Sequence, residues 1–231
     1  LVNSFRIDGS ASERGEILGE LVSYVLNHYP GVSAVMPGWF GAGSPVLSQL
    51  QSQNALSGGE FGGLYVLDGQ VLPGKEYIDL DAQLQERGKP DDPMKVTLKG
   101  LGTTSLIDHQ VKTLCERIAR RILGDSSPAL VTHIDLPMLF GSDWEGITRY
   151  FQALKLYRRL EYARADEILK RISFMPPARY LLAEIAFFNG DNTQAVELVS
   201  KEKPMLDQYP LQLELLFRSL DHRLKSEPDL E

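Results

Sequence analysis

The chain has 231 residues and a formal net charge of −7, from 31 acidic and 24 basic side chains. A hydrophobic fraction of 43% is ordinary for a soluble globular protein with a proper core. The acidic balance argues against a segment that grips a nucleic-acid backbone, because such contacts need a basic face. No apolar run approaches the roughly 20 residues of a membrane helix, so any anchor is expected outside this segment.

Cysteine and histidine give no sign of a metal centre. Cys115 is the single cysteine, which predicts neither an internal disulfide nor a cysteine-based metal cage. The histidines, His28, His109, His133 and His222, do not stand in a metal-ligand spacing with one another or with the cysteine. We therefore predict no metal and no cofactor. His28 follows a predicted helix, where a cation suits the helix dipole, and is interpreted as a surface residue.

The first third of the chain alternates between strand and helix signals. Residues 1–7 form a short strand candidate, and an apolar stripe at helical spacing follows within residues 8–31. Ser10 or Ser12 is expected to cap this helix, and Pro30-Gly31 to stop it. A second short strand is predicted over residues 32–36. Residues 44–56 predict another helix, because Pro45 suits a first helical turn.

The glycine-rich stretch 62–84, GGLYVLDGQVLPGKEYIDLDAQL, suggests either a phosphate loop or the bends of a sheet. A phosphate loop needs a strand, glycines and at once a helix with a Lys-Ser/Thr pair, which this sequence lacks. Instead, a β-rich run at 64–67 is followed by Asp68-Gly69, which we interpret as a bend or bulge. Strict apolar–polar alternation then covers residues 78–84 and 94–99. The sequence therefore predicts an antiparallel meander of three strands rather than a nucleotide site.

A helix closes this first domain, which we place at residues 1–124. Five apolar residues step by three or four along one face: Ile107, Val111, Leu114, Ile118 and Ile122. Thr103 or Thr104 is expected to cap the helix, and Gly124 to end it. The predicted first domain is a small α/β domain with a mixed sheet and its helices on one face.

The second half of the chain reads as all-helical, so the fold class predicted for the whole chain is α+β. Residues 125–142 carry turn residues without a helical period and are predicted to be a linker. Within 143–231, two helix–turn–helix units place Ala165 and Ala195 at matching positions, 195 − 165 = 30 residues apart. Gly190 supplies one turn, whereas Leu160 and its neighbours stand where the other turn glycine is expected. The pattern resembles the tetratricopeptide repeat, whose period is about 34 residues.

Three motifs in order carry a wider resemblance: YPGVSAVM at 29–36, the glycine-rich stretch at 62–84 and LIDHQVKTLCERIARRIL at 106–123. With the helical units behind them, they resemble the TolB-amino-terminal-like domain plus helical domain of ToxR/CadC-type and HilA-type bacterial transcriptional activators. A similar pair is attached to some class III adenylate cyclases. YVLDGQV at 65–71 is the most specific part.

The resemblance implies a non-catalytic sensory and protein-interaction region, most simply of a ToxR/CadC-like transcriptional regulator. It implies a periplasmic location in the CadC type and a cytoplasmic one in the HilA type. CadC-type domains carry a disulfide, which Cys115 alone cannot form internally. Expected partners are another protein or a small signal molecule, without direct nucleic-acid contact by this segment, and a homodimer stays open. The alternative is a stand-alone, envelope-associated assembly protein that binds through a helical groove.

Two sequence features are candidate binding sites. Trp39 and Phe40 lie in a Gly/Pro-rich loop, where large aromatic side chains either plug onto the core or form a contact. His133 and Asp135 lie in the predicted linker. A histidine beside a carboxylate between two domains titrates near neutrality and biases their packing, and an ordinary linker is the alternative.

Charged residues offer two further patterns. Arg149 and Arg158 head a locally basic run in the repeats, which continues with Arg159, Arg164, Lys170 and Arg171. Such a run is either a solvated face or a groove for an acidic peptide segment. Asp79 and Asp81 fall on one face of one strand and suggest a paired-carboxylate site, but we interpret them as solubilising residues of a solvated strand edge. No catalytic residue is predicted.

Overall fold

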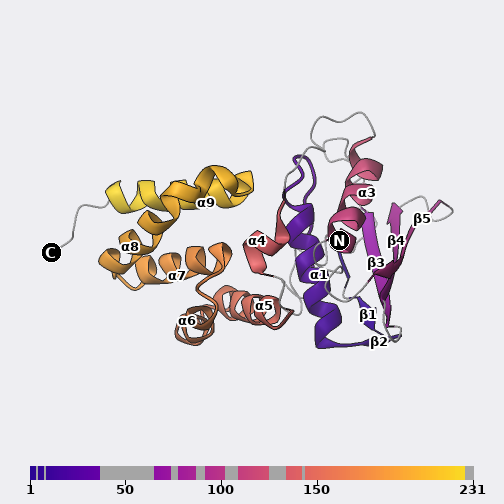
Figure 1. Cartoon of the computed structure of the whole chain (residues 1–231), viewed down its shortest axis with the longest axis horizontal. Coiled ribbons are helices and arrows are strands. Elements are labelled where there is room, and N and C mark those ends of the chain that lie inside the picture. The colour runs from indigo at the N-terminus through magenta and orange to yellow at the C-terminus, as the bar shows by residue number, and fades with distance from the viewer. Residues whose placement is uncertain are drawn as a thin grey trace, which may run out of the picture. The chain divides into compact units, whose positions relative to one another are not determined.

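The computed structural model describes residues 1–3, 5–7, 9–36, 65–73, 78–86, 92–101, 109–124, 134–141 and 144–226. The chain divides into two compact units, Leu1–Thr132 and His133–Glu231. The first unit combines strands with helices and the second is helical, which confirms the predicted α+β class at that level (Figure 1). The helix predicted at 44–56 lies outside the described residues.

In the described part of the first unit, one sheet has the strand order β2-β1-β3-β4-β5. Its strands are β1 (Arg6–Ile7), β2 (Ser10–Ala11), β3 (Tyr65–Pro73), β4 (Ile78–Glu86) and β5 (Met94–Leu101). β1 runs parallel to β3, and β3, β4 and β5 are antiparallel neighbours. The predicted three-stranded meander is confirmed. Gly69, the glycine of β3, pairs with Ala82 of β4 within this sheet.

The bend or bulge predicted at Asp68-Gly69 is wrong. The pairing of β3 with β4 continues without a shift through both residues, which lie opposite Gln83 and Ala82. A Cβ atom at Gly69 would stand only 2.1 Å from Cε1 of Phe5, a fully buried residue of the first segment. The glycine therefore makes room for an aromatic ring, and the strand stays regular.

The strand predicted at residues 32–36 is also absent from the described structure. Val35 does accept a backbone hydrogen bond from Val2, at 2.8 Å. The neighbouring Ala34 is bound by a side chain: Asn27 Nδ2 donates to its carbonyl at 2.9 Å, and its N–H donates to Asn27 Oδ1 at 2.8 Å. Because Asn27 occupies both backbone groups that a neighbouring strand would use, the segment is ordered without joining the sheet.

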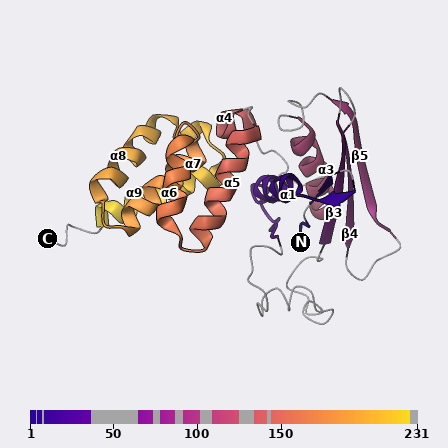
Figure 2. The same cartoon turned by 90° about the horizontal axis from the view of Figure 1, so that it is seen from below.

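Two long helices, α1 (Glu13–Leu26) and α3 (Val111–Leu123), lie on one face of the sheet (Figure 2). Ser12 caps α1 by accepting a hydrogen bond from Gly15 N–H at 3.1 Å. The helix ends four residues before Pro30, so the predicted stop at Pro30-Gly31 is too late. Gly124 ends α3 as predicted, with a φ of +84°. The expected caps Thr103 and Thr104 lie outside the described residues.

The second unit contains a short helix, α4 (Leu136–Phe140), inside the segment predicted as a helix-free linker. Asp135 caps it by accepting a hydrogen bond from Met138 N–H at 3.0 Å. Phe140 is fully buried and its ring lies 5.2 Å from that of Tyr150. The linker prediction is therefore corrected for this stretch. One buried helical turn is too short to show a period in the sequence.

Two helical hairpins and a final helix follow. Their elements are α5 (Trp144–Arg158), α6 (Tyr162–Arg171), α7 (Pro176–Phe188), α8 (Asn192–Glu202), the 3-10 helix η4 (Lys203–Gln208) and α9 (Leu211–Ser226). Equivalent positions of the two hairpins are 30 residues apart. Small residues occupy equivalent positions in the two hairpins: Ala153 corresponds to Ala183, and Ala165 to Ala195. All four alanines are fully buried. Alanines at these positions let the paired helices approach closely, as the sequence predicts for Ala165 and Ala195.

Candidate functional site

The face of the sheet opposite α1 and α3 carries a polar hollow. Strand alternation buries Leu67, Leu80 and Val96 on the helix side and turns their neighbours outward. The hollow has a volume of about 450 Å³, within the usual range for small-molecule sites. Its lining residues are Arg6, Asp68, Gly69, Gln70, Asp81, Ala82, Gln83, Lys95 and Thr97.

The strand register arranges these side chains in two rows across the sheet. The first row runs Arg6, Gln70, Asp81 and Thr97, one residue from each of β1, β3, β4 and β5. The second row runs Asp68, Gln83 and Lys95. Neighbouring strands are about 4.8 Å apart, so the side chains of one row stand side by side. Each row contains one cation and one carboxylate, with an amide side chain between them.

The charges in the hollow are balanced but are not paired with one another within the described residues. Asp68 accepts a hydrogen bond from Asn3 Nδ2 at 2.8 Å. Asp81 Oδ1 is enclosed and has no hydrogen-bond partner among the described residues. An enclosed carboxylate oxygen without a donor is costly, and such atoms are rare in folded proteins. Asp81 Oδ1 is therefore the atom of this face that most needs an external donor.

The sequence interpretation of Asp79 and Asp81 as residues of a strand edge is wrong. β4 is paired on both sides, to β3 and to β5, so it lies inside the sheet. The hollow itself was not predicted, because it depends on the pairing of β1 with β3 across more than 60 residues. The local sequence shows only that every second residue of these strands is polar. A solvated sheet face and a binding site give the same pattern.

Half of the site residues predicted from the sequence lie in the described second unit, and none of these lines the hollow. Asp135 is the cap of α4, Arg149 forms an ion pair with Glu145 on its own helix, and Arg158 is exposed at the end of α5. Trp39, Phe40 and His133 lie outside the described residues.

In the described part of the chain, three of the six residues in the run predicted as a basic face form ion pairs with carboxylates one helical turn away. The pairs are Arg149–Glu145, Arg164–Glu161 and Lys170–Asp166. Exposed pairs of this kind contribute a few tenths of a kcal/mol, and each cancels the charge of one basic residue of the run.

His28 is buried rather than a surface cation, with 7% of its surface exposed. Its Nδ1 lies 2.8 Å from the carbonyl oxygen of Tyr24, and its Nε2 is enclosed without a partner among the described residues. Burial lowers the pKa of His28 below its ordinary value of 6.5, against a smaller opposite effect of the Tyr24 hydrogen bond. Burial therefore favours the neutral form of the ring in the folded protein.

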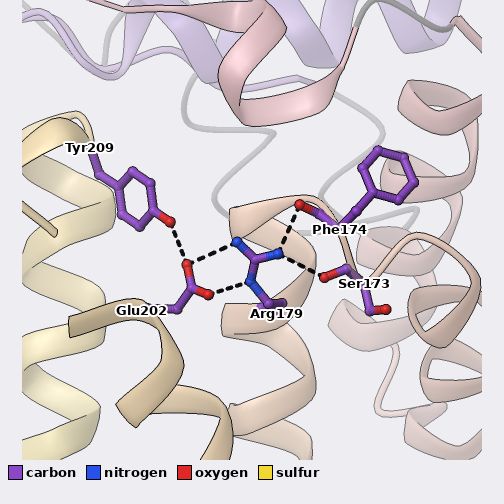
Figure 3. Close-up of polar contacts among 5 residues, drawn as sticks. All are labelled: Ser173, Phe174, Arg179, Glu202 and Tyr209. Carbon is purple, nitrogen blue, oxygen red and sulfur yellow. Dashed lines mark hydrogen bonds and ion pairs between the residues drawn. The ribbon is translucent and has the colours of Figure 1, made fainter. Parts of the chain in front are cut away.

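A buried ion pair fastens the second hairpin (Figure 3). The guanidinium of Arg179 contacts both carboxylate oxygens of Glu202, of which only 3% is exposed, and donates to the carbonyl oxygens of Ser173 and Phe174 at 2.9 and 2.8 Å. Tyr209 donates its hydroxyl to the same carboxylate. Burial, then the hydrogen bond to Glu202, raises the pKa of Tyr209 to about 12. Apart from Arg179 Nε, which contacts Glu202 without a hydrogen bond among the described residues, these groups satisfy one another, so we interpret the cluster as structural.

A second cluster joins three helices through Glu184. This carboxylate of α7 accepts hydrogen bonds from Tyr157 of α5 at 2.7 Å and from Tyr180 at 2.8 Å. Arg223 of α9 donates to it at 3.2 Å and lies 5.0 Å from the ring centre of Phe187. Burial and then Glu184 raise the pKa of both tyrosines above the ordinary value. α5, α7 and α9 are thus tied by one acceptor.

Among the described residues, no group of three or more histidine, cysteine, aspartate and glutamate side chains is placed to hold a metal ion, and none of the described helices combines the length and apolarity needed to cross a membrane. Comparison with known proteins found no matching family model, no matching curated protein and no matching solved structure.

Proposed function

We propose that this chain is a non-catalytic sensory and protein-interaction region of a bacterial signalling protein, of the kind attached to ToxR/CadC-like transcriptional regulators. In this proposal the first unit binds a small signal molecule in its polar hollow, and the helical unit engages a protein partner. The observation that carries the proposal is the set of balanced but mutually unpaired charges around Asp81, on a sheet face that α1 and α3 leave uncovered.

The arrangement of elements supports the proposal. A sheet with helices against one face, followed by helical hairpins, agrees with the layout of the TolB-amino-terminal-like domain plus helical domain. The 30-residue period and the buried alanines support a tetratricopeptide-like stack. Stacks of this kind serve as extended binding surfaces.

The chemistry of the lining also favours recognition over catalysis. Arg6 and Lys95 offer donors, the aspartates offer acceptors, and Gln70 and Gln83 offer both. Groups of these types, spread over four strands, can orient a polar ligand by several hydrogen bonds at once. A sensor needs this selectivity together with release of the ligand unchanged.

The proposal is tested by following ligand binding in both units of the full chain. A library of small polar metabolites is screened by thermal shift, and amide hydrogen exchange is then measured with each ligand that binds. We expect protection in β3, β4 and β5 and a change in exchange within α5–α9, because a sensory region has to transmit binding. Turnover of the ligand, protection confined to the sheet, or a screen without any ligand would each contradict the proposal.

A further inference from the structure

The positions of Arg6 and Asp81 define the ligand that the hollow can hold. They belong to the same cross-strand row, with Gln70 between them. Two strand spacings separate their Cα atoms, about 10 Å, a gap that a long arginine side chain and a small ligand can span together. Within the described residues, Arg6 and Asp81 do not form an ion pair with each other. A ligand with both a negative and a positive group would satisfy both.

The lining makes other ligand classes less suitable. Two cations and two carboxylates give a lining without net charge, whereas a site for a polyanion collects cations. The described lining residues include no aromatic side chain, so a nucleobase or the apolar face of a sugar ring has no stacking platform. The amides of Gln70 and Gln83 remain to hold a polar group beside the two charges.

We infer that the hollow binds a small zwitterion, a free α-amino acid, with its carboxylate on Arg6 and its ammonium group on Asp81. The Arg6 guanidinium suits a carboxylate because its parallel N–H groups match the two oxygens. The ammonium group supplies a positive partner for the Asp81 carboxylate, which lines the hollow and forms no ion pair among the described residues. Gln70, which lies between them, contacts the ligand centre, and Gln83 and Lys95 lie toward the ligand's side chain. This inference rests on the proposed function, since it names the signal molecule of the same site.

The charge requirement is tested on the unaltered full-length chain by isothermal titration with each standard L-amino acid in turn. We expect saturable binding of at least one, with a Kd between about 1 μM and 1 mM. The N-acetyl derivative of that amino acid has lost its ammonium group, and the methyl ester its carboxylate. Each derivative is expected to bind about tenfold more weakly or worse. This part of the experiment uses no variant, so its outcome does not depend on the folding of one.

The location is tested with matched variants. Asp81→Asn and Arg6→Gln are each expected to weaken binding about tenfold or more. Asp79→Asn and Lys99→Gln are the controls, because these residues share the outward phase of β4 and β5 but do not line the hollow. Both controls are expected to bind like the unaltered chain. Circular dichroism verifies that all four variants are folded.

Three results would overturn the inference: no amino acid binds, the charge-deficient derivatives bind as tightly as the parent, or Asp81→Asn and Arg6→Gln leave binding unchanged. The proposed function fails separately. If a neutral sugar or another metabolite protects β3–β5 and alters exchange in α5–α9, the zwitterion inference is wrong and the sensory function stands.

Discussion

Leu160 and Gly190 hold the same left-handed backbone conformation at equivalent places in two successive helical hairpins. Their φ angles are +63° and +79°. Each donates its N–H to the residue three positions earlier, Tyr157 or Phe187, at 2.9 and 3.0 Å. The next residue in each turn donates to the carbonyl five positions earlier, which completes a Schellman motif. The backbone thus forms the same turn with and without a glycine.

The strain at Leu160 predicts that a glycine there stabilises the protein. A left-handed conformation costs a residue with a side chain about 1–2 kcal/mol, and the Leu160 side chain is 72% exposed and contributes little packing. We expect Leu160→Gly to raise the free energy of unfolding of the helical unit by about 1 kcal/mol, measured by urea denaturation. Leu160→Ala removes the exposed side chain without relieving the strain, so it should be nearly neutral. A Leu160→Gly variant no more stable than Leu160→Ala would contradict this reading.

The buried pair of Arg179 and Glu202 predicts a large loss of stability when one partner is removed. Arg179→Met leaves a carboxylate that is only 3% exposed without its cation, and we expect a cost of about 3–5 kcal/mol in thermal or urea unfolding. The equivalent change 30 residues earlier, Arg149→Met, breaks only an exposed pair within α5 and should cost about 0.5 kcal/mol or less.

A double variant tests the cause of that loss. Arg179→Met combined with Glu202→Gln removes the stranded charge and should be more stable than Arg179→Met alone. Equal stability of the single and double variants would show that lost packing, rather than an unpaired carboxylate, destabilises the protein.

The contact between Phe5 and Gly69 predicts that the cost of Gly69→Ala depends on the side chain at position 5. Gly69→Ala places a methyl group 2.1 Å from a ring carbon of Phe5, and overpacking of this kind costs about 1–3 kcal/mol. In a Phe5→Leu background, the same substitution should cost less, because the ring is gone. Chemical denaturation of the four members of this cycle measures the coupling. Additive effects would mean that the strand needs a glycine for its backbone, as the sequence alone suggested.

The lowered pKa of His28 predicts how stability depends on pH. The unfolded chain binds a proton at His28 near pH 6.5, while the folded chain binds it only at lower pH. The contribution of the neutral ring is therefore fully present above about pH 6.5 and is lost as the pH falls toward the lowered pKa of the folded state. His28→Gln should flatten the pH dependence of unfolding below the ordinary histidine pKa of 6.5, between about pH 5 and about pH 6.5.

The exposed His222 provides the control for this pH effect. His222→Gln should leave the slope between the same pH limits as it is in the unaltered chain. Equal slopes for all three proteins would show that His28 is not the group that titrates.

Local patterns predicted the parts of the fold that depend on neighbours in sequence. The period-two runs of β4 and β5 and the stop of α3 at Gly124 were visible because each is determined by a few adjacent residues. The strand predicted at residues 32–36 was wrong because a contact outside the segment decides its structure. Its composition favours a strand, but the Asn27 side chain binds both backbone groups of Ala34.

The candidate site was less predictable than the fold. Asp81 belongs to a pattern that any half-buried strand shows, and its meaning depends on Arg6, which reaches the same row only through the parallel pairing of β1 with β3. Gly69 shows the same limit, because its role is decided by a ring that lies 64 positions earlier in the chain. Contacts between residues so far apart in the chain produce no pattern in the local sequence around either residue.

The 30-residue spacing of α5–α6 and α7–α8 makes the helical unit modular. A duplicate of residues 144–173, inserted after Ser173, would present the α5 surface to the preceding α6 and the α6 surface to α7, and the turn geometry at Leu160 would recur unchanged. The contact between α4 and α7 sets the limit of this modularity, because an inserted hairpin would separate these two helices. The hairpins are thus interchangeable in their own packing, whereas α4 fixes how many of them this chain can hold.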